Sequence, residues 1–320
     1  FRGFESHSLR QAKLPKNHKK KNCIFFNSSE CYKHIKIKMN NISVILLLFH
    51  TRKNLIENLK QYKDFKVLIL DQSNDLELKK KIKKFLPKIE YYHSTNINMG
   101  FARGVNFLAK KVKTKYFLCT QPDIRINKKS IKYLLNTFYL KKNCVISVPK
   151  IDDFKNFKIK NKKKIYPIKN IIGAIFLTEK KKFSNINMFD ENFFFYWEDV
   201  DISNRIQKSK YKIYINHNSK AVHTWSSTKF NLLTFYIKET NFKYGELFYQ
   251  HKNNKLKYIK ILRQPFTLFF YSLLYLLLLN PKKSLSNLFR INGIIKFIIE
   301  NLIIKRSIFN NSKLTKKKDF

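Results

Sequence analysis

Glycine, proline, cysteine and acidic side chains are all scarce in this sequence. Its 320 residues contain 6 Gly, 7 Pro and 4 Cys, and only 21 Asp and Glu. So little glycine and proline excludes a collagen-like chain, and so little cysteine excludes a small scaffold held together by disulfides. Hydrophobic residues still make up 44% and aromatic residues 15% of the chain. The sequence is therefore apolar enough to fold around a sizeable core.

The basic excess is large, with 66 Lys and Arg and a formal net charge of +45. Only nine of these 66 residues are Arg, whereas Phe and Tyr, which share A/T-rich codons with Lys, are abundant. This composition favours a codon bias that has filled exposed faces with Lys. A basic nucleic-acid-binding protein is an alternative, but it predicts Arg-rich clusters on one face, and here the best-organised motif is acidic. We therefore expect no nucleic-acid partner.

The first 38 residues differ in composition from the rest. Reverse-translated, the segment GFESHSLRQ resembles the end of a transfer-RNA gene, and the first methionine is Met39, directly before the apolar run ISVILLLF. We expect 1–38 to be an untranslated extension of the gene or, alternatively, a disordered basic arm. Residues 39–230 are predicted to form one domain, and residues 231–320 a separate helical region.

Short, nearly unbroken apolar runs alternate with Lys-rich helical patterns in residues 39–230. The apolar runs span 42–49, 67–70, 116–119, 145–148 and 171–177, and the helical patterns span 53–61, 76–85, 102–113 and 130–140. Continuous hydrophobicity in segments this short is typical of parallel strands covered on both faces. We predict an α/β fold with a Rossmann-like, mostly parallel sheet flanked by helices. Residues 155–169 are expected to form a mobile loop, and Cys119 and Cys144 to be buried thiols of a reducing compartment.

Polar residues follow several of the predicted strands, where ligands of such sheets bind. Asp71 follows 67–70 and could accept hydrogen bonds from a nucleotide base or ribose, or could simply form an Asx-type turn. Asp123 follows 116–119 and is a hard oxygen ligand that suits Mg²⁺ or Mn²⁺, or a helix N-cap. Between them, the segment NMGFARGVN at 98–106 holds two of the six glycines. Because glycine has no Cβ atom, this density of glycines indicates a main chain that comes close to another group.

The acidic residues concentrate in one place. Asp190, Glu191, Glu198, Asp199 and Asp201 fall within twelve residues, around the aromatic block FFFYW at 193–197. Partial desolvation by these rings would raise the basicity of a neighbouring carboxylate. The alternatives are helix capping by Asp199, core packing of the rings, and a structural ion pair between Asp201 and the residue four positions later, an arginine.

The last third of the chain is different in character. Residues 264–281 carry no charge, and the nearly apolar run 266–279 would reach about 21 Å as a helix, which is short of the ~30 Å hydrocarbon core of a bilayer. A second greasy helix is predicted over 288–304. Oily helices with basic flanks are typical of a membrane-surface anchor. A buried helix pair and a true membrane span are the alternatives.

Six motifs in order over residues 42–230 resemble family-2 glycosyltransferases with the GT-A fold, closest in pattern to rhamnosyltransferase-like members. They are ISVILLLF, the LDQS at 70–73, the NMGFARGVN turn, the QPD at 121–123, the Gly173-Ala174 strand and FDENFFFYWEDVDISNR. Two departures stand out. His50 stands where relatives usually have Asn, and Gln121 replaces the first acid of the usual Asp-x-Asp.

The resemblance implies a role for each motif. The donor nucleotide sugar is assigned Asp71, Ser73, Asn98, Gly100, Arg103 and Asn106. The divalent cation, Mg²⁺ or Mn²⁺, is assigned Asp123 and the late histidine of the family, His223. Asp199 is the implied catalytic base, with Glu198 as a second candidate. Alternatives remain open for four of these residues. Arg103 could lie at the surface, and Asn98 and Asn106 could simply cap a helix. His223 could have a structural role.

The function that follows is inverting transfer of a sugar, such as rhamnose or another hexose, from a nucleotide-diphosphate donor. The expected acceptor is a lipid-linked or cell-surface glycan, and the expected location is the cytoplasmic face of a bacterial plasma membrane, held peripherally or monotopically against its anionic surface. A catalytically inactive membrane-bound GT-A scaffold is the other alternative, although the presence of Asp123, Glu198 and Asp199 speaks against it.

Overall fold

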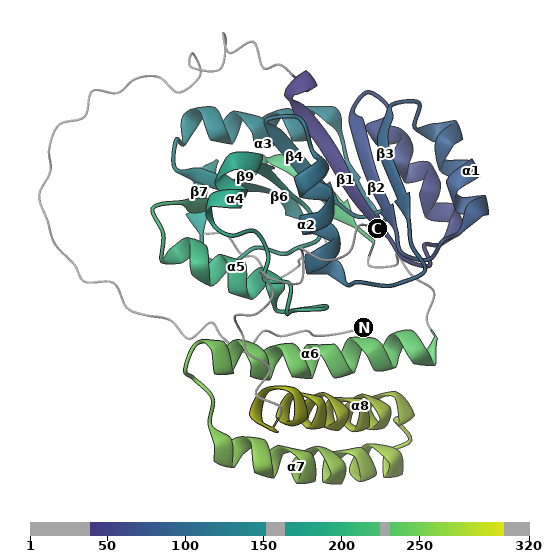
Figure 1. Cartoon of the computed structure of the whole chain (residues 1–320), viewed down its shortest axis with the longest axis vertical. Coiled ribbons are helices and arrows are strands. Elements are labelled where there is room, and N and C mark those ends of the chain that lie inside the picture. The colour runs from purple at the N-terminus through teal and green to yellow at the C-terminus, as the bar shows by residue number, and fades with distance from the viewer. Residues whose placement is uncertain (1–38, 152–163, 225–230, 304–320) are drawn as a thin grey trace, which may run out of the picture. The chain divides into compact units, whose positions relative to one another are not determined.

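The computed structural model describes residues 39–151, 164–224 and 231–303 (Figure 1). The expected extension 1–38 lies outside the described residues, as do residues 155–163 of the expected loop. The remainder of that loop is not a loop, because it contains the strand β7 (Ile165–Ile168), which pairs with a longer strand described below.

Nine strands of the described residues form a single sheet. They are β1 (Ile42–Leu48), β2 (Lys66–Asp71), β3 (Ile89–Ser94), β4 (Tyr116–Thr120), β5 (Ile124–Ile126), β6 (Cys144–Ile151), β7, β8 (Phe176–Glu179) and β9 (Lys212–His223). Their order is β3-β2-β1-β4-β8-β6-β9-β5, with β7 also beside β9. The continuous apolar runs of β1, β2, β4 and β6 are confirmed as buried strands.

The expectation of a mostly parallel sheet is wrong, because the sheet is mixed. β3, β2, β1 and β4 run parallel, as do β6 and β9, but β8 is antiparallel to both of its neighbours and β5 and β7 are antiparallel to β9. Parallel neighbours need a crossover connection, and no helix precedes β5 or β8 directly. The expected strand 171–177 is correspondingly shorter, and Gly173 and Ala174 lie in the turn before β8.

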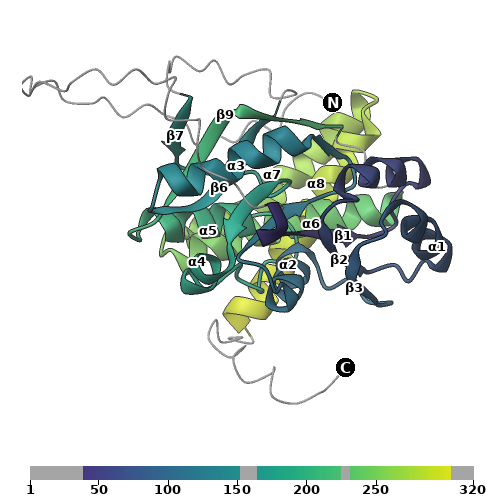
Figure 2. The same cartoon turned by 90° about the horizontal axis from the view of Figure 1, so that it is seen from above.

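Helices cover both faces of the sheet (Figure 2). The 3₁₀ helix η2 (Lys53–Tyr62), α1 (Leu76–Phe85) and α3 (Lys128–Leu140) bury apolar side chains in the core on one face. α2 (Phe101–Lys111), α4 (Lys180–Asn185) and α5 (Glu198–Gln207) do the same on the other. The four helices expected from the Lys-rich patterns are all present, with exposed lysines on their outer faces. Cys119 and Cys144 are buried free thiols, as expected.

Three helices follow the sheet: α6 (Leu232–Lys252), α7 (Tyr258–Leu277) and α8 (Pro281–Phe297), which continues into the π-helical turn Ile298–Ile303. α8 packs against both α6 and α7. The close approach of α8 to α6 depends on Gly293, where a Cβ atom would lie 2.4 Å from the carbonyl oxygen of Thr240. Glu239 of α6 accepts hydrogen bonds from Ser286 and Arg290 of α8, both at 2.7 Å.

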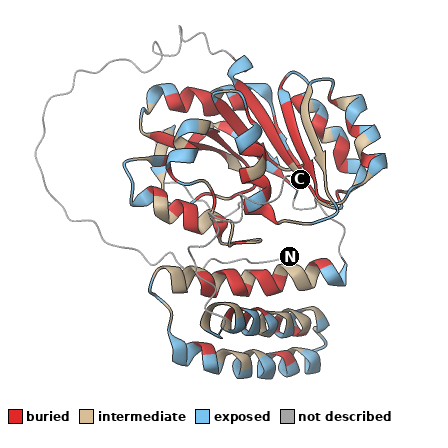
Figure 3. Cartoon of the chain, in the orientation of Figure 1, coloured by how far each residue is buried: buried red, intermediate tan, exposed pale blue. Residues whose placement is uncertain are grey.

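The helical region is joined to the sheet domain through aromatic side chains. Phe193, in the loop before α5, shares a buried cluster with Tyr244 and Phe248 of α6 and Phe297 of α8. The apolar run 266–279 is helical as expected up to Leu277, where α7 ends, but α7 begins earlier, so that Pro265 lies inside it. None of the described helices is long and apolar enough to cross a membrane. Most of the apolar side chains of α7 are exposed, as the pale blue of its surface in Figure 3 shows.

Candidate functional site

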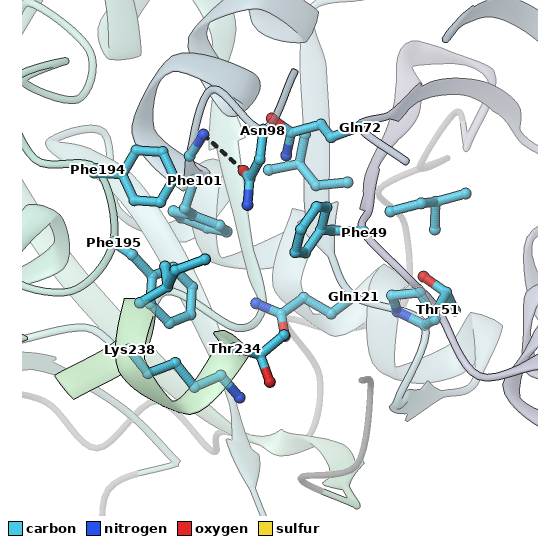
Figure 4. Close-up of a pocket in the computed structure, with 15 residues that line it drawn as sticks. Phe49, Thr51, Gln72, Asn98, Phe101, Gln121, Phe194, Phe195, Thr234 and Lys238 are labelled. Atoms are coloured by element: carbon cyan, nitrogen blue, oxygen red, sulfur yellow. Dashed lines mark hydrogen bonds between the residues drawn. The ribbon is translucent and has the colours of Figure 1, made fainter. Parts of the chain in front are cut away.

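A cavity of about 140 Å³ lies where β1, β2 and β4 end, which is where this class of sheet binds its ligands (Figure 4). Its walls come from the strand ends, the turn before α2, the loop before α5, and α6. The lining residues are Leu47, Leu48, Phe49, Thr51, Gln72, Asn98, Gly100, Phe101, Gln121, Pro122, Phe194, Phe195, Thr234, Ile237 and Lys238. The cavity is mostly apolar with a few polar groups, which is typical of a small-molecule site.

Asp71 is fully buried at the end of β2. Its carboxylate accepts hydrogen bonds from the Ser73 main-chain N–H and hydroxyl at 3.0 and 2.6 Å, and from the Asp75 N–H at 3.1 Å. The Tyr92 hydroxyl donates to it at 3.2 Å, and burial together with this carboxylate raises the pKa of Tyr92. The geometry favours the turn-forming role, and a contact of Asp71 or Ser73 with the donor stays a prediction. The neighbouring Gln72 is the residue of this turn that lines the cavity.

Asn98 and Gly100 lie at the cavity as the sequence predicts. The Asn98 side-chain oxygen accepts the Gly100 N–H at 3.0 Å, and its amide nitrogen has no partner among the described residues (Figure 4). Gly100 has a φ of +85°, and a Cβ atom there would lie 2.2 Å from the carbonyl oxygen of Phe194. The expected close approach at Gly100 is therefore confirmed. The group that approaches it is the main chain of the segment 190–201, which we call the acidic segment. The N–H of Phe101 donates to this same oxygen at 2.8 Å.

Arg103 and Asn106 are placed away from the cavity lining. Arg103 is exposed, and its Nε donates to the carbonyl oxygen of Glu191 at 3.3 Å. Asn106 is buried, donates to the Phe189 carbonyl oxygen at 2.9 Å and to Glu191 Oε1 at 3.0 Å, and accepts the Phe189 N–H at 3.1 Å. Both side chains hold the acidic segment against α2, and the predicted contacts of both with the donor stay predictions.

Asp123 and His223 are brought together by pairing of β5 with β9, in which Ile124 lies opposite His223. His223 Nε2 lies 3.2 Å from Asp123 Oδ2, and both side chains are buried. A carboxylate and an imidazole are suitable ligands for Mn²⁺, and a carboxylate also suits Mg²⁺. The described residues contain no group of three or more such side chains. These two would therefore supply only part of a coordination shell.

The acidic segment divides into paired and unpaired carboxylates. Asp201 binds Arg205 Nε at 2.8 Å, as its spacing predicts, and also Lys252 Nζ at 2.7 Å. Lys252, at the end of α6, binds Asp190 at 2.7 Å as well. In contrast, Glu198 and Asp199 form no ion pair within the described parts of the chain. Helix α6 thus neutralises Asp190 and Asp201 through Lys252. Glu191 instead accepts a hydrogen bond from Asn106.

Glu198 and Asp199 begin α5, with Trp197 rather than Asp199 as the N-cap. Burial and then the charge of Asp199 raise the pKa of Glu198 well above its ordinary range. Burial also raises the pKa of Asp199, although the main-chain N–H groups of Val200 and Gly173 oppose this effect. Both carboxylates are therefore more basic than ordinary ones, as a proton acceptor requires. The Oε2 atom of Glu198 is buried and has no hydrogen-bond partner in the described part of the chain.

The backbone before this pair is strained. Tyr196 and Trp197 have φ values of +68° and +72°, which bulky residues rarely adopt. Consecutive left-handed residues are costly and concentrate at functional sites. Neither carboxylate lines the cavity, but both follow closely in the chain on Phe194 and Phe195, which do.

Several lining residues are absent from the set predicted from the sequence. Gln72 and Gln121 follow predicted strands, so the strand-end rule could have included them. Lys238 had no such signal, because it is one of many lysines and lies on a helix beyond the recognised motifs.

Comparison with known proteins identifies the family of this chain. The model of the family described as "Glycosyl transferase family 2" matches residues 43–204. Curated proteins gave no match. Among solved structures, the chain is similar to GalNAc-T7 with UDP, GalNAc and Mn²⁺, at 13% identity over 57% of this chain and 42% of that one, with a TM-score of 0.48. It is also similar to TarS 1-349 of S. aureus, at 13% identity over 80% of this chain and 91% of that one, with a TM-score of 0.47. The chain thus spans less than half the length of the GalNAc-T7 chain.

Proposed function

The chain belongs to glycosyl transferase family 2, and we propose that it moves a sugar from a nucleotide-diphosphate donor to a lipid-linked or cell-surface glycan, with inversion at the anomeric carbon. The family-level resemblance and the expectation of a glycosyltransferase are confirmed; the rhamnosyltransferase-like subgroup, and rhamnose or another hexose as the sugar, stay predictions. One observation carries the proposal. Two carboxylates of raised pKa begin α5. They follow the cavity-lining Phe194 and Phe195 in the chain and have no ion pair among the described residues.

The carboxylate pair supplies the proton acceptor. Inverting transfer is a single displacement, in which the acceptor hydroxyl loses its proton as its oxygen attacks the anomeric carbon. Asp199 is our candidate for the base. Hydrogen bonds from main-chain N–H groups stabilise its ionised form and so limit the rise in its pKa. Glu198 is more strongly held in the protonated form, which makes it the second candidate.

The diphosphate would lie towards Asp123 and His223. When bound there, Mg²⁺ or Mn²⁺ would neutralise the negative charge of the leaving diphosphate. The 3.2 Å separation of the two side chains fits a shared ligand role, and donor phosphate oxygens would complete the shell. At the other end of the cavity, Gln72 and Asn98 offer amide groups suited to a nucleobase or sugar.

The exposed face of α7 supports association with a membrane surface. Phe266 and Phe270 are 69% and 67% exposed, and Leu277 is 80% exposed. Near the start of α7, Lys257, Lys260 and Arg263 surround a second cavity together with Tyr258 and Ile259. Helix α7 thus has an apolar outer face with basic residues near one end. These two features fit the surface of an anionic bilayer. A lipid-linked acceptor would be presented at that surface, and the buried free thiols fit the cytoplasmic side.

The test is incubation of the protein with a panel of nucleotide sugars and Mn²⁺, with release of the nucleoside diphosphate measured for each. We expect hydrolysis of one donor or a small group of related donors, accelerated when the correct glycan lipid is supplied. Absence of both diphosphate release and donor binding across uridine, guanosine and thymidine donors would contradict a transferase.

A further inference from the structure

Lys238 lies in the second turn of α6, and its side chain reaches the cavity at the end where Gln121 and Thr234 also line it (Figure 4). Of the fifteen lining residues it is the one with a cationic side chain. Helix α6 lies beyond residues 43–204, which the family model matches. This cation is therefore contributed by a part of the chain outside the shared domain.

Lys238 has no ion-pair partner within the described residues. The other two lysines of α6 are both paired, Lys243 with Glu246 at 2.8 Å and Lys252 with Asp190 and Asp201 at 2.7 Å. Lys238 has neither an ion pair nor a hydrogen bond there, although it is half-buried. Burial lowers its pKa, and the charge of Asp123 opposes this effect.

A half-buried ammonium group without a partner is unfavourable unless an anion enters the site. Such an anion would lie in the cavity near the Asp123–His223 pair. We propose that Lys238 binds the diphosphate of the nucleotide-sugar donor, so that α6 completes the donor site. This inference rests on the proposed function, because the diphosphate is that of its donor.

The proposal also gives the helical region a second role. The same helix neutralises Asp190 and Asp201 through Lys252 and packs under Phe193. Helix α6 would then connect the donor site with the acidic segment and with the helices α7 and α8.

The test compares Lys238→Met with the wild-type full chain by isothermal titration calorimetry. The probes are UDP, GDP and thymidine diphosphate with Mn²⁺, followed by the monophosphate and nucleoside of whichever base binds. We expect diphosphate binding to weaken about ten- to a hundred-fold, which is the effect of losing one charge-assisted contact. Binding of the free nucleoside should change less than about two-fold. Lys238→Arg should recover most of the affinity, and Lys132→Met, at an exposed lysine of α3, should bind as the wild type does.

The other outcomes separate the two proposals. Wild-type diphosphate affinity in a folded Lys238→Met variant would overturn the role of Lys238 and leave the proposed function standing. Binding of none of the three diphosphates to the wild type would overturn both. If Lys238→Met does not fold, Lys238→Gln and inorganic pyrophosphate as the probe give the same comparison. Loss of vesicle binding with unchanged diphosphate affinity would instead assign Lys238 to a lipid phosphate and overturn the proposal.

Discussion

His223 Nε2 lies 3.2 Å from Asp123 Oδ2, although one residue directly precedes the short strand β5 and the other ends the long strand β9. The antiparallel pairing of these strands sets this distance, because Ile124 is opposite His223. The N–H of Thr224 also donates to the carbonyl oxygen of Asp123 at 3.1 Å. Main-chain hydrogen bonds and the side-chain contact thus both hold Asp123 and His223 together.

Asp123→Ala and His223→Ala should each reduce Mn²⁺-dependent binding of a nucleoside diphosphate by about ten- to a hundred-fold. The physical reason is that each variant would remove one of the two candidate ligands that the described residues bring together. Calorimetry with and without Mn²⁺ measures the difference. Equal diphosphate affinity of the wild type with Mn²⁺ and with a chelator would show that the pair has only a structural role.

Asp199→Asn should keep donor binding while the rate of transfer falls by about 10² to 10⁴, the usual contribution of a general base. The amide has the same shape as the carboxylate but cannot accept the acceptor's proton. Glu57→Gln, at an exposed residue of η2, is the matched control and should leave the rate unchanged. Retained turnover in Asp199→Asn would move the base role to Glu198.

The raised pKa of Asp199 also predicts the pH dependence of transfer. The base works only when ionised, so the rate should fall as the pH falls through a pKa above the ordinary aspartate value of 3.8. A profile of kcat/KM against pH locates this acidic limb. A limb at the ordinary value would mean that the carboxylate is well solvated when substrate is bound.

Glu198→Gln should stabilise the protein at neutral pH. The folded state holds the Glu198 proton more tightly than the unfolded state, whose ordinary pKa is 4.5. Below that pH both states are protonated and the substitution should have little effect. Above it, ionisation of the unfolded state lowers the stability of the wild type, so the gain from Gln should grow with pH to on the order of 1 kcal/mol. Urea unfolding at pH 4 and pH 7.5 measures the gain, and equal stability of the two proteins at both values would contradict the prediction.

Gly100→Ala should destabilise the fold by about 2 kcal/mol or more. Its φ is +85°, and the added methyl group would lie 2.2 Å from the carbonyl oxygen of Phe194, which is backbone and cannot rotate away. Gly173→Ala is the matched control, because the nearest atom there would be at an ordinary contact distance of 3.5 Å. Thermal unfolding of both variants measures the contrast, and similar stability of the two would contradict the described turn.

The double variant Phe266→Ser/Phe270→Ser should weaken binding to phosphatidylglycerol vesicles by ten-fold or more. Burial of a phenylalanine side chain contributes about 1.5 to 3 kcal/mol, and both rings are exposed on α7. Vesicle co-sedimentation measures the effect, with Tyr139→Ser on α3 as the control at another exposed aromatic residue. Failure of the wild type to bind such vesicles would remove the membrane from the proposed function.

The parts of the fold that could be predicted are those whose pattern is local. Buried parallel strands have continuous apolar runs because both of their faces are covered, so β1, β2, β4 and β6 are visible in the sequence. Strand β9 was not predicted, since its polar residues satisfy long-range contacts. Asn216, for example, donates to the carbonyl oxygen of Tyr133 at 2.7 Å and contacts Thr137 of α3.

The sequence by itself determined the family motifs, the strand-end positions of Asp71 and Asp123, and the cluster of acidic residues between Asp190 and Asp201. Only the tertiary structure decided which members of that segment are neutralised, because Lys252 reaches Asp190 and Asp201 from a distant helix. It likewise distinguished Lys238 from the other lysines, since composition cannot show which ammonium group is half-buried without a partner. Scarcity made the acids informative in the sequence, whereas the abundant lysines became informative only through their positions in space.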